Sequence, residues 1–421
     1  MNDILTSARR LPQRVIIRVL KRMFTLPAPA ARLILNDIIK PKKIHKQWIY
    51  RVRRRENKGW FGCWIGDNLH KLDPVSLLKR VHEANVILFY VHGGSFRLGN
   101  STMYMDTNIS WLKMLKERHG LSAMIMSLKQ RALAPEHKFP GPIEDVVRAY
   151  EYLISKIEVK PEKIVIIGDS AGAALLLNML LITHDPTSFE MTKHHQALPR
   201  PAGIVLSSPF VTDKTGSESW KSNQKYDYIT EYGMKIIKRD CFEDMQTTEY
   251  PILDITALQT EFSSFLSRKM LCFVGQLEVF RDDTLTFVNR LQQDDIDCQV
   301  VMEQCVHDWF CVREVVKNKS ILRNADEIFA DYCFQTIQRR ADNKKDIMDN
   351  DSHTIASISS ISCIDSDYSS ILHRYESSSF TEDDDDDALV YSIINFRLSK
   401  TSLNEQDDRP PSQCSSDIVF L

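Results

Sequence analysis

The chain has 421 residues, of which 43% are hydrophobic and 26% charged, and its formal net charge is −2. This composition excludes a collagen-like, low-complexity or uniformly basic protein and is typical of a globular one. The charge is unevenly placed, since residues 1–60 hold 16 Lys and Arg against 3 Asp and Glu, whereas residues 341–421 hold 6 against 17. We therefore divide the chain into a basic N-terminal segment (1–45), a central domain (46–340) and an acidic, Ser-rich tail (341–421).

The nine cysteines are scattered and form neither a Cys-x-x-Cys pair nor a Cys/His cluster with metal-ligand spacing. We predict reduced thiols, no metal site and no cofactor. Reduced thiols favour a protein that faces the cytosol. No hydrophobic signal core precedes a cleavage site, so we expect a cytoplasmic protein, or one bound peripherally to the endoplasmic reticulum or a lipid droplet.

Residues 11–26 predict a basic amphipathic helix, because one face collects the apolar side chains Leu11, Val15, Ile16, Val19, Leu20, Met23 and Phe24. Its apolar run is too short to span a bilayer. Three interpretations remain open. The helix could cap the core, dock on an anionic membrane surface, or belong to a mitochondrial presequence, the last weakened by Asp3 and Asp37.

Two short aromatic and β-branched runs within residues 46–65 predict two edge strands. Between them stands Arg53-Arg54-Arg55. No recognisable nucleic-acid-binding module or row of interleaved aromatic residues accompanies this run, so we interpret it as a solvated turn or a phospholipid contact. We expect no nucleic acid partner.

From residue 85 onwards, apolar strands alternate with helical segments. Strands are predicted at 86–91, 123–128, 164–167, 204–207, 271–274 and 298–302, and helices near 105–118, 142–157, 171–183, 281–293 and 325–339. This alternation predicts an α/β fold with a mostly parallel central sheet flanked by helices on both faces. The segment 210–268 is longer than a simple crossover connection needs, so we predict additional helices in it, beside a pocket. The tail predicts disorder, with 388–396 as a short helix or partner-binding segment.

The organising motif is Gly168-Asp169-Ser170-Ala171-Gly172, which follows four β-branched residues and precedes an apolar helical run. A Ser in so sharp a strand-to-helix turn has a strained backbone, and the glycines let strand and helix approach closely. Its hydroxyl projects above the sheet, as in the nucleophile elbow of α/β-hydrolases. We therefore predict Ser170 as a nucleophile.

A Ser nucleophile needs a base and an acid, which follow it in the order Ser, acid, His in this fold. His307 lies directly after the last predicted strand, whereas His184, His194 and His195 have no strand before them. We therefore predict His307 as the base. The preceding strand ends in a loop with three carboxylates, of which Glu278 is nearest the strand end and is our candidate acid.

Asp282 is the reserve candidate, although Asp282 and Asp283 are better placed to begin the following helix. The oxyanion donors are expected in His92-Gly93-Gly94, after strand 86–91. The main-chain N–H groups of Gly93 and Gly94, with that of Ala171, would surround the developing negative charge. His92 precedes Ser170 in the chain, and we interpret it as an orienter of this loop.

The chain resembles the hormone-sensitive-lipase family of α/β-hydrolases, and within it esterases of the arylacetamide deacetylase and steryl acetyl hydrolase type. The resemblance covers about residues 85–315 and is carried by His92-Gly93-Gly94, Leu133–Pro140, Gly168–Gly172, Ser208-Pro209, Ser219-Trp220, Asn223 and Val306-His307. It implies Ser170, Glu278 and His307 as the triad, Gly93, Gly94 and Ala171 as the oxyanion hole, and a lid of N-terminal helices.

Three positions depart from the family pattern: Ser95 replaces a third Gly, Arg131-Ala132 replaces Tyr-Arg, and Glu278 replaces Asp. None removes a catalytic group. We expect a serine hydrolase of small hydrophobic carboxylic esters, such as a short-acyl or sterol ester. Two alternatives are a non-catalytic binding protein on the same fold, as in the plant gibberellin receptors, and an amide hydrolase, since fold does not fix the leaving group.

Overall fold

A computed structural model describes residues 12–52, 60–130, 133–186, 197–242 and 254–349. These residues form one eight-stranded sheet with the strand order β1-β2-β4-β3-β5-β6-β7-β8. The strands are β1 (Ile49–Arg51), β2 (Gly62–Ile65), β3 (Val86–Val91), β4 (Ala123–Leu128), β5 (Ile164–Asp169), β6 (Gly203–Ser207), β7 (Lys269–Gly275) and β8 (Asp297–Glu303). In this order, every pair of neighbouring strands from β4 through β3, β5, β6 and β7 to β8 is parallel.

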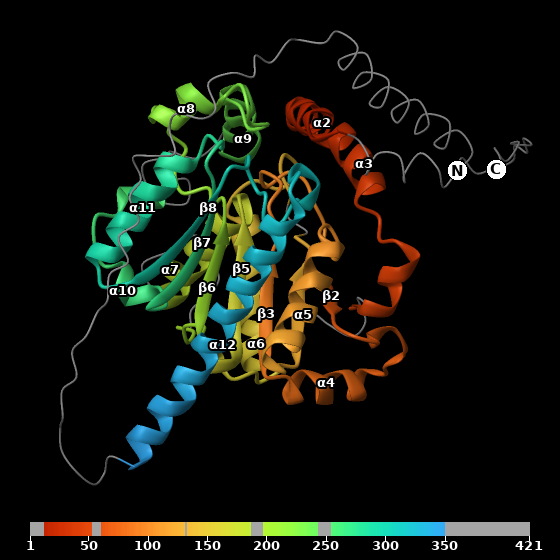
Figure 1. Ribbon diagram of the computed structural model, residues 1–421, viewed down its shortest axis with the longest axis vertical. Helices are drawn as coiled ribbons and strands as arrows, with labels where there is room; N and C mark the ends of the chain where they lie inside the picture. The colour runs from red at the N-terminus through yellow and green to blue at the C-terminus, as the bar shows by residue number, and fades with distance from the viewer. Residues whose placement is uncertain (1–11, 53–59, 131–132, 187–196, 243–253, 350–421) are drawn as a thin grey trace, which may run out of the picture.

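The six strands predicted from residue 86 onwards are all confirmed, with ends that agree within two residues. Every residue of β3, β5 and β6 is buried, which explains their continuous apolar sequences. Because these strands are parallel, their carboxyl ends meet at one edge of the sheet. The loops expected to carry chemistry all leave from that edge (Figure 1).

The prediction of two edge strands within residues 46–65 was wrong for β2. Of these two strands β1 is at an edge and β2 is not, because β2 pairs antiparallel with β1 on one side and with β4 on the other. The approach to β4 is so close that a Cβ on Gly62 would lie 2.1 Å from the carbonyl oxygen of Ser127. Cys63, Trp64 and Ile65 are accordingly buried, which an edge position does not require.

Helices cover both faces of the sheet (Figure 1). α5 (Met105–His119) and α12 (Lys319–Asp349) pack together on one face, and α6 (Gly141–Ser155) and α7 (Ala171–His184) pack on the other. α12 begins before its predicted start and continues to Asp349, past the boundary expected at residue 340. The predicted tail, including residues 388–396, lies almost entirely outside the described residues.

Further helices lie between the strands. The segment 210–268 contains α8 (Glu218–Asn223), α9 (Glu231–Phe242) and α10 (Phe262–Phe265), which confirms the helices predicted there, and α11 (Arg281–Gln293) follows β7. α4 (Pro74–Glu83) was not predicted, although its start carries a clear signal. The Asp73 side chain accepts bonds from the N–H groups of Val75 and Ser76, and Pro74 occupies the first helical position.

Two N-terminal helices, α2 (Gln13–Thr25) and α3 (Ala28–Ile38), lie above the carboxyl ends of the strands (Figure 1). Val15, Val19 and Met23 of α2 are buried, and they pack with α3 and with Leu98 in a small hydrophobic cluster. This placement corresponds to the cap interpretation of the basic amphipathic segment. Of the basic residues on α2, Lys21 donates a hydrogen bond to the carbonyl of Gln224.

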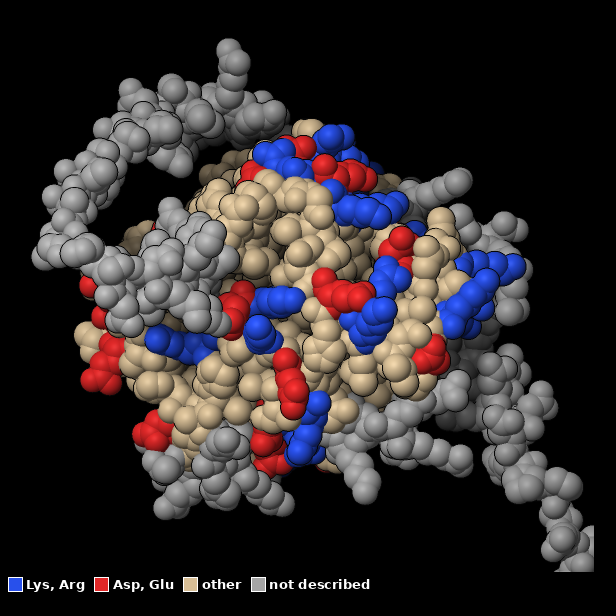
Figure 2. Space-filling view, turned by 90° about the horizontal axis from the view of Figure 1, so that it is seen from below, with Lys and Arg blue, Asp and Glu red and all other residues tan. Residues whose placement is uncertain are grey.

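The end of the molecule opposite α2 and α3 carries both basic (Lys, Arg) and acidic (Asp, Glu) side chains, interspersed among uncharged residues (Figure 2). Within the described ranges, no helix is both long enough and apolar enough to cross a bilayer. The seven cysteines in the described part of the chain are all buried free thiols. Burial raises the pKa of Cys63 to about 11 and that of Cys298 to about 12, so both are uncharged thiols at neutral pH.

One buried hydroxyl joins α12 to the sheet and generates a stability prediction. The Tyr332 hydroxyl accepts the N–H of Ile204 at 2.9 Å and bonds to the carbonyl of Lys269 at 2.8 Å. Tyr332→Phe removes these hydrogen bonds from a buried position, so the free energy of unfolding should fall by about 1–3 kcal/mol in urea denaturation. Tyr232→Phe, at a side chain that is 62% exposed, is the control and should change it by less than about 0.5 kcal/mol.

Candidate active site

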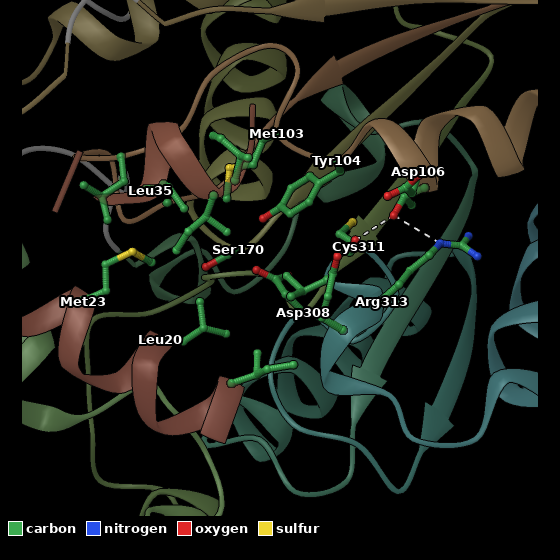
Figure 3. Close-up of a pocket in the computed structure, with 18 of the residues that line it drawn as sticks. Leu20, Met23, Leu35, Met103, Tyr104, Asp106, Ser170, Asp308, Cys311 and Arg313 are labelled. Carbon is green, nitrogen blue, oxygen red and sulfur yellow. Dashed lines mark hydrogen bonds between the residues drawn. The ribbon is translucent and has the colours of Figure 1, made fainter. Parts of the chain in front are cut away.

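Ser170 stands at the turn between β5 and α7 with φ 48° and ψ −118°, a strained left-handed conformation. Its N–H donates to the carbonyl of Ser207, at the end of the neighbouring strand, at 2.9 Å. The strain expected from the Gly-x-Ser-x-Gly motif is confirmed. The turn directs the Ser170 side chain towards a cavity above the sheet (Figure 3).

The two glycines of the motif allow this geometry through close packing. A Cβ on Gly172 would lie 2.1 Å from the carbonyl oxygen of Val91, and one on Gly168 would lie 2.8 Å from the backbone of Ala173. Real Cβ atoms do not approach other atoms so closely. The glycines are therefore required because α7 begins directly against β3 and β5.

His307 approaches Ser170 from the loop after β8. Its Nε2 lies 2.9 Å from the Ser170 Oγ, within hydrogen-bond distance. The ring is buried, with the rings of Phe280 and Tyr228 packed edge-on at centroid distances of 5.0 and 5.5 Å. Burial lowers the pKa of His307 to about 3, so the imidazole is neutral at pH 7 and can accept a proton from the Ser170 hydroxyl.

Glu278 lies on the other side of His307, in the loop after β7. Its Oε2 is 3.8 Å from the His307 Nδ1, longer than a hydrogen bond, and it accepts a bond from the Ser208 hydroxyl. Burial raises the pKa of Glu278 well above its usual range. The structure thus brings Ser170, His307 and Glu278 together in the predicted order, with the acid and the base in contact but not yet bonded.

The reserve acid Asp282 does not reach this site. It lies in the first turn of α11, where its carboxylate accepts the N–H of Ser219 at 2.8 Å and pairs with Arg281 at 2.8 Å. Asp283 is in the same turn and accepts the indole N–H of Trp220 at 3.1 Å. Both carboxylates occupy the start of the helix, as expected, and Glu278 is the carboxylate of this loop that faces His307.

The loop after β3 requires one correction. Gly93 was predicted as an oxyanion donor, but its N–H already donates to the Asp169 Oδ2 at 2.9 Å. Gly94 lines the cavity together with Ser170 and His307, and Ala171 is the first residue of α7, where an N–H has no partner within the helix. The candidate donors are therefore Gly94 and Ala171, with Ser95 next to Gly94 in the same loop.

Asp169, which sequence reasoning passed over, explains why Gly93 is engaged. Its buried carboxylate accepts the hydroxyl of Tyr90 at 2.6 Å, the hydroxyl of Tyr104 at 3.1 Å and the N–H of Gly93. Burial raises the pKa of Asp169 to about 6, while these hydrogen bonds oppose the shift. The residue before the nucleophile thus holds the oxyanion loop, and its position inside the motif was the available signal.

His92 contributes to the same loop as predicted, because its ring nitrogen Nδ1 lies 2.8 Å from the carbonyl oxygen of Gly93. Burial lowers the pKa of His92 to about 4, so the ring is neutral. Gly99 packs directly against the His92 ring, since a Cβ at position 99 would lie 2.5 Å from that ring. The ring and the loop therefore fix one another. The predicted departure at Arg131-Ala132 lies outside the described residues.

Arg97 connects this loop to the N-terminal helices. It is a fully buried arginine that donates to the carbonyls of Phe24 at 3.4 Å and Leu26 at 3.0 Å, at the C-terminal end of α2. Its Nε lies 2.8 Å from a carboxylate oxygen of Asp240 in α9. One guanidinium thus joins the oxyanion loop, the cap and α9.

The cavity above Ser170 measures about 150 Å³ and is mainly apolar. Figure 3 shows Leu20 and Met23 of α2 on one side of Ser170 and Met103 and Tyr104 on the other. Polar residues at one end, among them Asp106 and Arg313, mark the cavity's connection to the surface. The nucleophile candidate therefore stands in a small apolar chamber roofed by the N-terminal helices.

Asp308 is a further cavity residue that the sequence did not single out. It has a left-handed backbone with φ 55°, and its Oδ2 lies 3.3 Å from the His307 Nε2. Burial and the neighbouring carboxylates of Asp169, Glu278 and Asp227 raise its pKa well above the usual range.

Comparison with known proteins agrees with the fold. A family model described as the alpha/beta hydrolase fold matches residues 88–311. An esterase of Acinetobacter venetianus is 27% identical over 225 residues, covering 52% of this chain and 65% of that protein. Mouse arylacetamide deacetylase is 33% identical over 139 residues, covering 31% of this chain and 33% of that protein.

A Schizosaccharomyces pombe protein named as a steryl acetyl hydrolase is 21% identical over 238 residues, covering 53% of this chain and 59% of that protein. The chain thus spans less than two thirds of the length of each of these relatives. Among solved structures, a hormone-sensitive lipase from a metagenome library has a TM-score of 0.60 at 19% identity, covering 78% of this chain and 99% of that one. At this identity the likeness concerns the fold alone.

The buried environment of His307 generates a titration prediction. Because burial lowers its folded-state pKa to about 3, the ring should remain neutral from pH 8 down to pH 5, and NMR should show no change in its ring proton shifts over this range. An unfolded His has a pKa near 6.5, so this group favours the folded state above that pH and loses its contribution as the pH falls towards 3.

The spectrum of His307→Gln identifies the His307 signals and serves as the control. A midpoint at or above pH 6.5 in the folded protein would contradict the prediction.

Proposed function

Because the chain belongs to the α/β-hydrolase fold family, whose model matches residues 88–311, we propose that it is a serine hydrolase of carboxylic esters. The observation that carries this proposal is the 2.9 Å contact between the Ser170 Oγ and the His307 Nε2 at the floor of an apolar cavity. Relatives named esterase and arylacetamide deacetylase support the same reaction class.

In the first half of the reaction, the Ser170 Oγ attacks the ester carbonyl carbon while His307 takes the hydroxyl proton on Nε2. The carbonyl oxygen becomes an oxyanion, stabilised by the N–H groups of Gly94, Ser95 and Ala171. The intermediate collapses as His307 returns the proton to the leaving alkoxide. The products are an alcohol and an acyl group bound to the Ser170 Oγ.

In the second half, His307 removes a proton from water, whose oxygen attacks the acyl carbon. Collapse of this second intermediate breaks the bond to the Ser170 Oγ, and His307 returns the proton to it. The acid is released and the free hydroxyl is restored. Each proton that His307 accepts is thus returned within the same half-reaction.

Glu278 supports the imidazolium form of His307 in this scheme. The 3.8 Å between the Glu278 Oε2 and the His307 Nδ1 is roughly 1 Å longer than a charge-assisted hydrogen bond. Such contacts often shorten when a substrate binds. A positive charge on His307 attracts the carboxylate and lowers its pKa, so proton transfer from Ser170 to His307 favours closure of this gap.

The cavity supports a short acyl group as the preferred substrate part. A cavity of about 150 Å³ with an apolar lining can hold a molecule of about the size of benzene. Acetyl and butyryl groups fit within such a volume. A longer chain exceeds this volume, so we propose acetyl or short-acyl esters of hydrophobic alcohols as the substrates.

Replacing the nucleophile tests the reaction. Ser170→Ala should lower kcat for p-nitrophenyl butyrate by at least about 10³-fold, because no other group forms the acyl-enzyme. A fluorophosphonate probe should label the unchanged protein and not this variant. Ser264→Ala, at an exposed helical position, is the matched control and should behave as the unchanged protein. Full hydrolysis by Ser170→Ala would rule the proposal out.

The cavity volume generates a second prediction about acyl length. The value of kcat/KM should be at least about 10-fold higher for p-nitrophenyl butyrate than for the laurate ester, because extra methylenes find no space. Met23→Ala should reduce this ratio by enlarging the chamber. Leu33→Ala, at an exposed position of α3, should leave it unchanged. Equal values for the two esters would contradict the assignment of this cavity as the acyl site.

A further inference from the structure

One buried carboxylate outside the predicted site contacts both loops that carry Glu278 and His307. Asp227 lies between α8 and α9 and is 1% exposed. Its Oδ2 accepts the N–H of Val279, the residue after Glu278, at 2.8 Å. Its Oδ1 lies 3.4 Å from the main-chain nitrogen of His307 and accepts its N–H. Asp227 therefore bridges the loop after β7 and the loop after β8.

We propose that Asp227 is a positioning residue for the hydrolysis proposed above, on which this inference rests. Its carboxylate sets the separation between the acid and the base by holding the main chain beside Glu278 and at His307. That separation is now 3.8 Å between the Glu278 Oε2 and the His307 Nδ1. A change of less than about 1 Å there decides whether a hydrogen bond forms.

The chemistry of the contact explains why a carboxylate is needed. Both loops present N–H donors to position 227, and a third donor, the N–H of Tyr228, bonds to the Asp227 Oδ1 at 2.7 Å. An ionised carboxylate only accepts hydrogen bonds, so both of its oxygens suit these donors. An Asn in this place would direct its NH₂ group at one of these N–H groups, and the hydrogen bond to that loop would be lost.

Burial of Asp227 has a measurable cost that its hydrogen bonds offset. Burial raises the pKa of Asp227 to about 7, and the N–H groups of Val279, Tyr228 and His307 oppose this shift. The negative charge also contributes to the raised pKa of Glu278. A second buried carboxylate beside Glu278 is unfavourable in itself. The hydrogen bonds that Asp227 accepts from the two loops offset this cost.

The same segment holds the rest of the acid loop. The Asn223 amide donates to the carbonyls of Gln276 at 3.1 Å and Glu278 at 2.9 Å. The Ser219 hydroxyl donates to the carbonyl of Val279 at 2.7 Å. Ser219 and Asn223 lie four residues apart in α8, and Asp227 follows shortly after the end of that helix. Of these three, Asp227 extends the contact to His307.

The experiment compares Asp227→Asn with the unchanged protein, using p-nitrophenyl butyrate. We expect kcat to fall by about 10- to 100-fold with KM changed by less than about twofold, because the substrate cavity is intact and the acid–base geometry is not. In hydrogen exchange, peptides containing the amides of Val279 and His307 should lose protection. A kcat within about twofold of the unchanged protein would overturn the proposal.

Asp283→Asn is the matched control, since that carboxylate bonds to the Trp220 indole in the same region and contacts neither loop amide. Its kcat should stay within about twofold. If Asp227→Asn does not fold, Asp227→Glu tests the positioning role instead, because it retains the carboxylate acceptors and shifts them by the length of one methylene. It should also lower kcat without raising KM, and a rise in KM that matches the fall in kcat overturns the proposal.

The two proposals fail in different ways. If the unchanged protein hydrolyses no ester and is not labelled by a fluorophosphonate, the proposed function fails. The exchange measurement still tests whether Asp227 holds the two loops, because it needs no activity. If the unchanged protein is active and Asp227→Asn keeps both its kcat and its amide protection, only the positioning role is refuted.

Discussion

The left-handed backbone of Ser170 is the constraint on which the site depends. A side-chain-bearing residue at φ 48° is unfavourable by roughly 1–3 kcal/mol, so the surrounding structure must impose it. Two features do so: the hydrogen bond from the Ser170 N–H to Ser207, and the close contact of Gly172 with the Val91 carbonyl. The parallel sheet positions both, because β3, β5 and β6 end side by side. The nucleophile's orientation is thus a property of the whole sheet.

The fold was largely predictable because its strands are buried on both faces and read as continuous apolar runs. The interior place of β2 was not, since it follows from an antiparallel pairing with β4 that local composition does not encode. The extent of α12 was also missed, because its polar C-terminal part lacks the apolar periodicity that marks a packed helix. Local pattern thus identified the buried elements, and long-range pairing decided the rest.

The site shows the same division. Ser170, Glu278 and His307 were found because chain order and strand ends restrict where a nucleophile, an acid and a base can stand. The engagement of Gly93 and the bridge made by Asp227 depend on hydrogen bonds to residues more than 50 positions away in the sequence. Residue type alone does not reveal such contacts. A carboxylate in a connecting segment is indistinguishable from a surface residue until its partners are known.

The buried guanidinium of Arg97 restricts how the roof of the chamber can open. Separating the Phe24–Leu26 turn from the body strips a buried charge of acceptors, whereas the other end of α2 is tied by a neutral hydrogen bond from Gln13 to the Val315 carbonyl. The first separation is the more costly. The end of α2 at Gln13 is therefore the less firmly held one. The loop that carries the oxyanion donors is thus also the firmer attachment of the cap.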